Sequence, residues 1–505
     1  MRPSRVIRAT LAAALAGGLV LLPTTAGGVS GATTGTTASD INQRYLVVLT
    51  GTQEQGEFTG TATTGAVNSL VRAAGGTIAT DLSSRIGVLT VESANPAFAQ
   101  TLATSPLVAE VGSDWRWKGL PDASQVTPMK APGGNDNPDS ADDAGEPLQW
   151  DMQQIRTDEA HDVQAGLPAV DVGILDSGID GNHPEFKKAG VSNVDCARGR
   201  NSLAALPPGV AVGTPDPCVD NQFHGTHVAG TVGMRANGLG LVGVAPNVTL
   251  VPVKVCDTSG FCYASAVVDG ITYSGDEQFD VINMSFFVDD NEFQESTEFK
   301  CSSDPTQRAF RHAVERAISY ARNQGVTPVA ALGNSEQDLA HPVGEDGQPI
   351  SNECEVVPAE TQGVIGTASL GSNSEKAGYS NYGTGATDIA APGGNGSTGD
   401  CTRTVPSTFP GTGYVCIQGT SMASPHAAGV AALIVSQYGT LGSDGDVKMS
   451  PQRVEALLQG SAIDIGLSGY DECFGHGRID ALRAVTKNTS RASDGSAPNC
   501  PEYAE

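Results

Sequence analysis

The strongest constraint on the fold is a regular alternation of short apolar runs with stretches of helical period between residues 169 and 369. We predict strands over 169–175, 248–255, 281–287, 326–332 and 364–369, and helices over 264–274 and 307–323. The second helix carries a stripe with the spacing of a buried face, formed by Phe310, Val314, Ala317, Ile318 and Ala321. This alternation is typical of a three-layer α/β sandwich, in which helices cover both faces of a mainly parallel central sheet. Functional residues of such sheets lie at the carboxyl ends of the strands.

A separate small α+β unit is predicted over residues 40–118. Its strands and helices follow in the order βαββαβ, at 44–50, 66–74, 77–82, 86–92, 96–104 and 107–112. This order is that of a ferredoxin-like sandwich. The next segment, 119–147, is rich in Pro, Gly, Asp, Asn and Ser, and we expect an exposed linker there, where proteolytic nicking concentrates. The large unit then covers 148–485, and a short polar tail covers 486–505.

The first 32 residues have the layout of a secretory signal peptide. Three arginines (Arg2, Arg5 and Arg8) precede an apolar run of 14 residues over 9–22, and small residues follow up to Ala26 and Ala32. Cleavage after either alanine fits the pattern. A transmembrane helix needs roughly 20 apolar residues, more than this run offers. We therefore expect a secreted, extracellular protein with no membrane association after the signal is removed.

The cysteine content agrees with export, and the negative net charge argues against nucleic acid as a partner. The chain has 29 Lys and Arg against 56 Asp and Glu, a formal net charge of −27, which repels phosphate backbones and argues against binding nucleic acid. An even number of cysteines, ten, in an exported chain indicates disulfides. The sequence does not fix their connectivity. Our working hypothesis pairs neighbours, as Cys196–Cys218, Cys256–Cys262, Cys301–Cys354, Cys401–Cys416 and Cys473–Cys500.

Four short motifs place reactive side chains at the ends of predicted strands or at helix starts. Asp176 lies in DVGILDSGID, His224 and His227 in NQFHGTHVAGTVG, Asn334 in VAALGNSEQ, and Ser421 in GTSMASPHAAGVAALI. Asp176 and Ser421 have an ordinary alternative, since Asp and Ser often cap helices. The histidine pair lacks the spacing and the glutamate of a metallopeptidase helix. A serine at a helix N-terminus lies among backbone N–H groups that favour developing negative charge, and an asparagine amide can donate to an oxyanion.

Asp, His, Asn and Ser in this order, each in its own motif, resemble the subtilisin-like serine peptidases, the subtilases. The resemblance covers residue 150 to about 485. It implies that Ser421 attacks the peptide carbonyl and that His224 takes and returns the proton. It also implies that Asp176 orients the imidazole, and that Asn334 and the Ser421 N–H bind the oxyanion. His227 is then expected to be structural.

The same resemblance implies how the protein is made and used. Residues 40–118 resemble the inhibitory propeptide of the family, which implies cleavage in or near 119–147. We expect a secreted endopeptidase that acts on proteins or peptides, is a monomer, and needs no organic cofactor. The alternative from another class is a non-catalytic binding protein on the same fold, because fold alone does not determine function. The four intact motifs and the retained propeptide segment favour the enzyme.

Subtilases bind substrate as an extra strand between two edge segments. The corresponding residues here are Ser259, Gly260, Ser285, Phe286, Phe287, Ala331, Leu332 and Gly333. The chain departs from the family at 285–288, where it has Ser-Phe-Phe-Val and many members have Ser-Leu-Gly-Gly. Phe287 replaces a glycine that leaves space for substrate, so the side-chain preference stays open. If Phe287 blocks one end of the cleft, the enzyme would trim short peptides as an exopeptidase.

The segment RANGLGLVGVAP resembles the calcium-binding loop of the family. The resemblance implies a structural Ca²⁺ held by oxygens of Glu185, Arg235, Asn237, Leu239 and Leu241, a set that suits a hard cation. A Gly-rich turn without metal is the alternative, since such loops are common.

Overall fold

The computed structural model describes residues 39–54, 57–60, 64–122, 126–130, 132, 143–206, 213–286, 304–343, 348–349, 351, 353–397, 400–443, 445–494 and 500. The predicted signal peptide, Phe287 and Cys301 lie outside these residues, as does half of the predicted tail.

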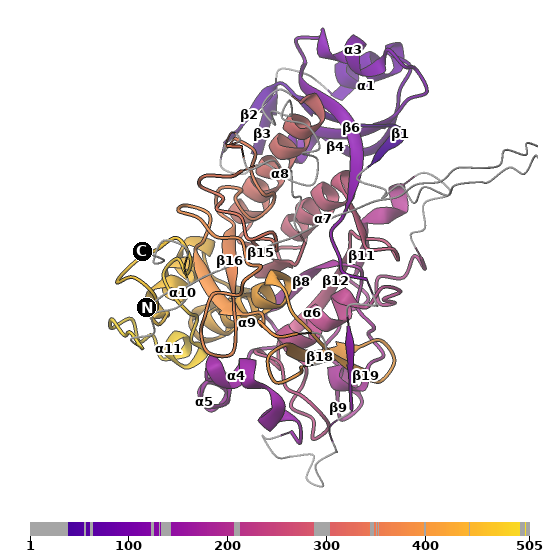
Figure 1. The fold of residues 1–505 in the computed structure, drawn as a ribbon. Coiled ribbons are helices and arrows are strands. Elements are labelled where there is room, and N and C mark those ends of the chain that lie inside the picture. Colours follow the sequence, from indigo (N-terminus) through magenta and orange to yellow (C-terminus); the bar gives the residue numbers. More distant parts are fainter. Residues whose placement is uncertain are drawn as a thin grey trace, which may run out of the picture. The chain divides into compact units, whose positions relative to one another are not determined.

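A parallel sheet of seven strands forms the centre of the large unit (Figure 1). Its spatial order is β11 (Arg200–Asn201), β12 (Thr249–Lys254), β8 (Asp171–Asp176), β14 (Val281–Met284), β15 (Thr327–Ala331), β16 (Ile365–Leu370) and β17 (Ile389–Pro392). All six neighbouring pairs are parallel. The chain runs from β8 to β12 on one side and then crosses to β14 on the other. Such a change of direction opens a crevice at the carboxyl ends of the strands.

Helices cover both faces of this sheet, which confirms the three-layer α/β prediction. Along β8, Val172 and Ile174 belong to the core with α6 (His224–Gly233) and α9 (Thr420–Tyr438). Leu175 points to the opposite core, with α7 (Ala264–Asp276) and α8 (Pro305–Asn323). The predicted stripe of α8 is fully or almost fully buried. Asp304 starts α8 by accepting from the backbone N–H groups of its first turn, and Pro305 follows at its first position.

Residues 39–118 contain the predicted strands and helices, and in addition the short helix α2 and a hairpin. The elements are β1 (Ser39–Leu49), α1 (Thr64–Ala73), β4 (Thr77–Leu82), α2 (Ser83–Ile86), β5 (Val88–Glu92), α3 (Phe98–Ala103) and β6 (Val108–Lys118). A hairpin that was not predicted, β2 (Gly51–Glu54) and β3 (Glu57–Gly60), follows β1. Strand β6 ends at Lys118 and not near Gly112, because its last residues pair with β13 (Phe261–Tyr263) of the large unit. The sheet order is therefore β13-β6-β1-β5-β4.

Described residues of the segment expected to be an exposed linker pack against the large unit. Strand β7 (Thr127–Met129) pairs with β19 (Gly413–Ile417), which also pairs with β18 (Val405–Phe409). Leu120 and Asp143 are each 2% exposed. The remaining short elements are α4 (Trp150–Gln154), α5 (Thr157–His161), β9 (Lys187–Lys188), β10 (Val191–Ser192), β20 (Thr440–Leu441), β21 (Val447–Lys448), α10 (Pro451–Ser461) and α11 (Ala481–Val485).

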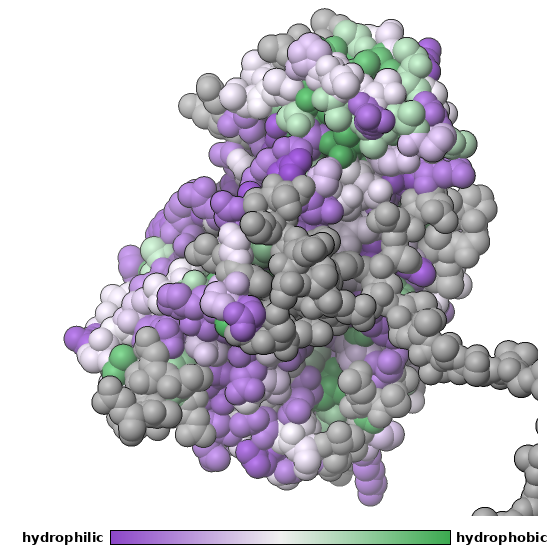
Figure 2. Space-filling model, turned by 45° about the horizontal axis from the view of Figure 1, so that its top comes forward, coloured by the Kyte–Doolittle hydropathy of each residue, from purple (hydrophilic) through white to green (hydrophobic). Residues whose placement is uncertain are grey.

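Four of the five hypothesised disulfides are present in the structure: Cys196–Cys218, Cys256–Cys262, Cys401–Cys416 and Cys473–Cys500. The fifth hypothesised pair includes Cys301, which is not among the described residues, and Cys354 is itself disulfide-bonded. The described helices include none that is long and apolar enough to cross a membrane. Figure 2 shows hydrophilic residues over much of the described part of the face it draws.

Candidate active site

A buried His–Asp pair lies at the carboxyl end of β8. Asp176 is the last residue of this strand, and His224 is the first residue of α6. The Nδ1 atom of His224 lies 2.9 and 3.0 Å from the two carboxylate oxygens of Asp176, and both side chains are fully buried. Nδ1 therefore donates to the carboxylate. The other nitrogen, Nε2, is buried without a hydrogen-bond partner among the described residues, which leaves it able to accept a proton.

Asp220 holds the loop before His224, and the sequence analysis missed it. Its carboxylate accepts from the backbone N–H groups of Gln222, Phe223 and Thr226, and from the hydroxyls of Ser177 and Thr226. Phe223 has a φ of 111°, a sparsely populated conformation for a residue with a side chain. These bonds fix the strained backbone from which α6 starts. The position of Asp220 shortly before the histidine motif was a usable signal for a capping residue.

Ser421 and Asn334 meet His224 in one cavity of about 550 Å³. Ser421 is the second residue of α9 and is 5% exposed. Gly419, directly before α9, has φ 155° and ψ 161°, a conformation that is open to glycine. Its carbonyl accepts from the N–H groups of Met422 and Ala423 in the first turn of the helix. Helix α9 thus begins at the cavity wall with Ser421 in its first turn, among N–H groups that have no partner within the helix.

Asn334 follows β15, and its amide group is held on one side. Its Oδ1 atom accepts from the backbone N–H and the hydroxyl of Thr420, each at 2.9 Å. The same hydroxyl accepts from Gly333 N at 3.1 Å. Because Oδ1 is occupied, Nδ2 is the group that can donate into the cavity. The geometry therefore offers a hydroxyl, an imidazole acceptor and an amide donor around a common space.

A sequence model of the subtilase family matches residues 168–477, more than half of the chain. The chain belongs to the subtilase family. It is 34% identical over 316 residues to Subtilisin DY of Bacillus licheniformis, which covers 63% of this chain and 90% of that protein. To Subtilisin E of Bacillus subtilis strain 168 it is 30% identical over 337 residues, covering 66% of this chain and 71% of that one. This subtilase is a serine endopeptidase.

The structure of this subtilase is similar to that of the epidermin leader peptide processing serine protease EpiP of Staphylococcus aureus. The TM-score is 0.65 at 22% sequence identity, over 89% of this chain and 99% of EpiP. At this identity the similarity shows the fold.

In this subtilase, the chain that follows β6 enters the cavity. Residues 118–122 line it together with His224, Asn334 and Ser421. The N–H groups of Gly119 and Leu120 each lie 3.1 Å from the carbonyl oxygen of Gly260, one of the predicted substrate-binding residues. Since β6 already pairs with β13, this segment continues an added strand along the edge of the large unit.

The other predicted substrate-binding residues have different surroundings. Ser259 is exposed, whereas Ser285, Phe286, Ala331 and Leu332 are fully buried. The Phe286 ring is 6.4 Å, centroid to centroid, from Trp117 of β6. The backbone of Gly333 is bound by the Thr420 hydroxyl and by the N–H of Asn381. Phe287, which departs most from the family, is outside the described residues.

The second histidine of the HGTH motif is a core residue. His227 is fully buried, and its Nε2 lies 3.2 Å from the carbonyl oxygen of Val405. Burial lowers the pKa of His227 to about 3, so the ring is neutral across the working range of most enzymes.

The predicted calcium ligands lie together around one loop. Glu185 Oε1 accepts from Leu241 N at 3.0 Å and from the Tyr414 hydroxyl at 2.5 Å. Asn237 Oδ1 accepts from Leu239 N, and Arg235 N donates to the Glu185 carbonyl. Burial raises the pKa of Glu185 to about 7. Its other oxygen, Oε2, is buried and has no hydrogen-bond partner among the described residues.

A second carboxylate that the sequence analysis missed, Asp143, faces the same loop. It accepts from the N–H groups of Asn237 and Gly238, and burial raises its pKa too. Two buried carboxylates, one with an unsatisfied oxygen, fit a cation. The hydrogen bond from the Tyr414 hydroxyl to Glu185 is the alternative, because it can hold the loop without a bound metal ion.

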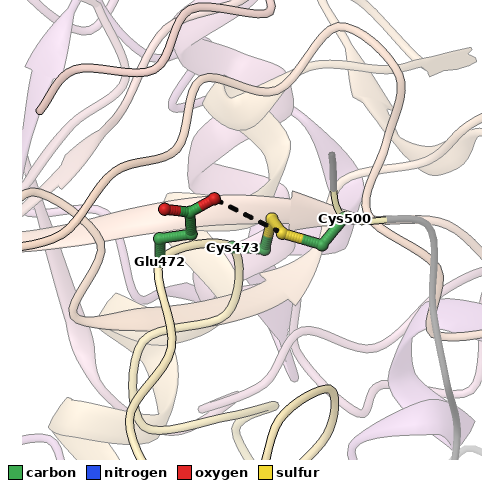
Figure 3. A group of neighbouring side chains, drawn as sticks. All are labelled: Glu472, Cys473 and Cys500. Atoms are coloured by element: carbon green, nitrogen blue, oxygen red, sulfur yellow. Dashed lines mark hydrogen bonds between the residues drawn. A yellow bond between two sulfur atoms is a disulfide. The ribbon is translucent and has the colours of Figure 1, made fainter. Parts of the chain in front are cut away.

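Glu472, Cys473 and Cys500 form another cluster of potential ligands (Figure 3). Both sulfurs belong to the Cys473–Cys500 disulfide, and Glu472 Oε1 is 3.9 Å from Cys500 Sγ. Neither sulfur is a thiolate, so the cluster lacks the ligands of a thiolate metal site.

Proposed function

We propose that Ser421 is the nucleophile of this endopeptidase and His224 its general base. The observation that carries the proposal is the His224 ring. Asp176 binds its Nδ1 atom, while Nε2 is buried, has no hydrogen-bond partner in the described part of the chain and shares a cavity with Ser421. An imidazole held in this tautomer takes a proton at Nε2 and returns it to the leaving amine. The carboxylate of Asp176 stabilises the charged ring that forms in between.

Asn334 and the Ser421 N–H are the proposed oxyanion donors. Nδ2 of Asn334 is oriented by the two bonds that Thr420 makes to Oδ1. The N–H of Ser421 lies in the first turn of α9, where helix N–H groups lack internal partners. Donors that are fixed in advance stabilise the negative oxygen of the tetrahedral intermediate without reorganising.

The proposed substrate is an extended segment of a protein or peptide. The backbone of Ser259 and Gly260, next to β13, provides one edge, and the segment that begins at Ser285 provides the other. Residues 331–333 lie across the primary specificity pocket. The packing of residues 116–120 along β13 supports this arrangement, because it uses main-chain bonds that any sequence can make.

We further propose that the protein is secreted as a monomeric precursor. Residues 1–32 would direct export, and 40–118 would inhibit the enzyme until cleavage in or near 119–147. Residues 118–122 line the cavity with His224 and Ser421 and bind Gly260, where the proposed substrate strand would lie, which supports inhibition. Asp114 and Arg44 of the N-terminal unit also form a buried cluster with Ser265 of α7.

We propose a structural Ca²⁺ at the loop formed by Glu185, Asn237 and the carbonyls of Arg235, Leu239 and Leu241. The Glu185 Oε2 atom, which no described residue binds, and the neighbouring Asp143 support it. Thermal unfolding of the Ser421→Ala protein should shift to lower temperature when a chelator replaces calcium, and Glu185→Gln should lose this response. An unchanged midpoint would favour the Tyr414–Glu185 bond as the metal-free alternative.

The function is tested with secreted wild type beside Ser421→Ala and His224→Ala. Wild type should cleave unfolded casein into peptides of mixed length, and both variants should lose almost all activity. Single residues or dipeptides as the main products would instead support an exopeptidase. N-terminal sequencing of the same samples tests maturation. A Ser421→Ala protein that is shortened as wild type is would contradict self-processing and point to another protease.

A further inference from the structure

Helix α9, which carries Ser421, contains Pro425 four residues after Ser421. In an α-helix the N–H of residue i+4 donates to the carbonyl of residue i. For Ser421 that donor position is Pro425, which has no N–H. The Ser421 residue is 5% exposed, so water is a poor substitute. A buried carbonyl without a donor is costly, and here it belongs to the proposed nucleophile.

Ser285 supplies the missing donor. Its Oγ atom lies 2.8 Å from the carbonyl oxygen of Ser421. Ser285 is fully buried and comes directly after β14, which pairs with β8 and β15, the strands that lead to Asp176 and Asn334. The bond therefore ties the first turn of α9 to the strands that carry the other reactive groups.

Proton counting fixes the direction of this bond. A carbonyl only accepts, so the single hydroxyl proton of Ser285 goes to Ser421 O. The Ser424 hydroxyl, 2.9 Å from Ser285 Oγ, must then be a donor to it, and Asn283 Nδ2 donates to the same oxygen at 2.8 Å. All three side chains are fully buried. The Ser285 hydroxyl is saturated and has no capacity left to bind a substrate.

We propose that the Ser285 side chain is a positioning residue, which replaces the N–H that Pro425 lacks and so holds Ser421 in its reactive place. This rests on the proposed role of Ser421 as nucleophile. It differs from a substrate-binding role of the same side chain, because the hydroxyl faces the helix.

The test separates turnover from binding. Ser285→Ala should lower kcat about 10- to 100-fold, since small displacements of a reacting group have effects of this size, and should leave KM unchanged. The rate at which a fluorophosphonate probe labels Ser421 should fall in parallel. Ser424→Ala is the matched control, because it removes a hydroxyl from the same cluster but keeps the Ser285–Ser421 bond. A raised KM with unchanged kcat and labelling would overturn the proposal.

A second variant tests the cause. Pro425→Ala restores an N–H at the position that faces the Ser421 carbonyl. The kcat of the Ser285→Ala/Pro425→Ala double variant should therefore be at least about tenfold higher than that of Ser285→Ala alone. No recovery would contradict the proposal. If Ser285→Ala does not fold, Pro425→Ala is compared with the double variant, and equal kcat values within about threefold are expected. Absence of any label on wild-type Ser421 would contradict the nucleophile assignment itself.

Discussion

Asn334 contributes two different groups to the site, since Thr420 binds its Oδ1 atom while Nδ2 can donate into the cavity. Asn334→Asp keeps the acceptor and the shape but removes both N–H donors. We expect kcat on a peptide substrate to fall about 100- to 1000-fold with little change in KM, the magnitude established for an oxyanion donor in subtilisin, a member of the same family. Thr420→Val is the control, since it loosens Oδ1 but keeps the donor. An equal loss in both variants would indicate that Asn334 acts by position alone.

For single residues, the sequence was sufficient where the signal lies in a short contiguous motif. Asp176, His224 and Ser421 each stand in a motif that carries its own signal. The bond from Ser285 to Ser421 joins residues 136 positions apart and depends on how β14 and α9 meet, which no local pattern reports. The calcium loop is similar, because Asp143 lies in a segment that was expected to be an exposed linker and is instead 2% exposed.

Among the elements, the three-residue strand β13 is the edge along which an extended segment pairs. It pairs with β6, and the Cys256–Cys262 disulfide anchors its central residue. This bridge spans only 6 residues of sequence, and Cys473–Cys500 spans 27, so chain entropy predicts costs of about 2 and about 3.5 kcal/mol for their removal. Removal of Cys256–Cys262 should therefore cost less stability than removal of Cys473–Cys500, but we expect it to have the larger effect on substrate binding. The Cys256→Ser/Cys262→Ser variant should raise KM for an extended peptide, and Cys473→Ser/Cys500→Ser should not.

Denaturant unfolding and steady-state kinetics on both variants check this crossed expectation. A raised KM in the Cys473→Ser/Cys500→Ser protein, or an unchanged one in the Cys256→Ser/Cys262→Ser protein, would contradict the role given to β13. The strands of the parallel sheet were predictable because each is a local apolar run. The extension of β6 to Lys118 was not, because its last residues are ordered by pairing with a distant segment.

For the whole molecule, buried carboxyl groups set the direction of the pH dependence of stability. Burial raises the pKa of Asp280 to about 8 from an ordinary value of 3.8, with Asp446 and Asp171 adding to the rise and Arg198 opposing it. Between about pH 4 and pH 8 the unfolded chain is ionised at this position while the folded chain keeps the proton. The free energy of unfolding should therefore be highest below this window and fall as pH rises through it, by up to about 1.4 kcal/mol per pH unit for one such group.

Urea unfolding of the inactive Ser421→Ala protein measures this slope without autolysis. Burial also raises the pKa of Glu360 to about 8 and of Asp388 to about 7, so several groups act in the same direction. Asp280→Asn should reduce the slope, because asparagine keeps an oxygen that can accept from Asp171 N but does not ionise. A slope that is unchanged in this variant would show that Asp280 ionises in the folded protein at its ordinary pKa.

The central claim is that His224, oriented by Asp176, activates Ser421. The most direct measurement is to treat the mature protein with a fluorophosphonate probe at neutral pH and to locate the modified residue by peptide mass spectrometry. The account predicts a single modified residue, Ser421, with labelling that is lost in Ser421→Ala and slowed by orders of magnitude in His224→Ala. Labelling of another serine, or labelling of Ser421 at the same rate without His224, would contradict it.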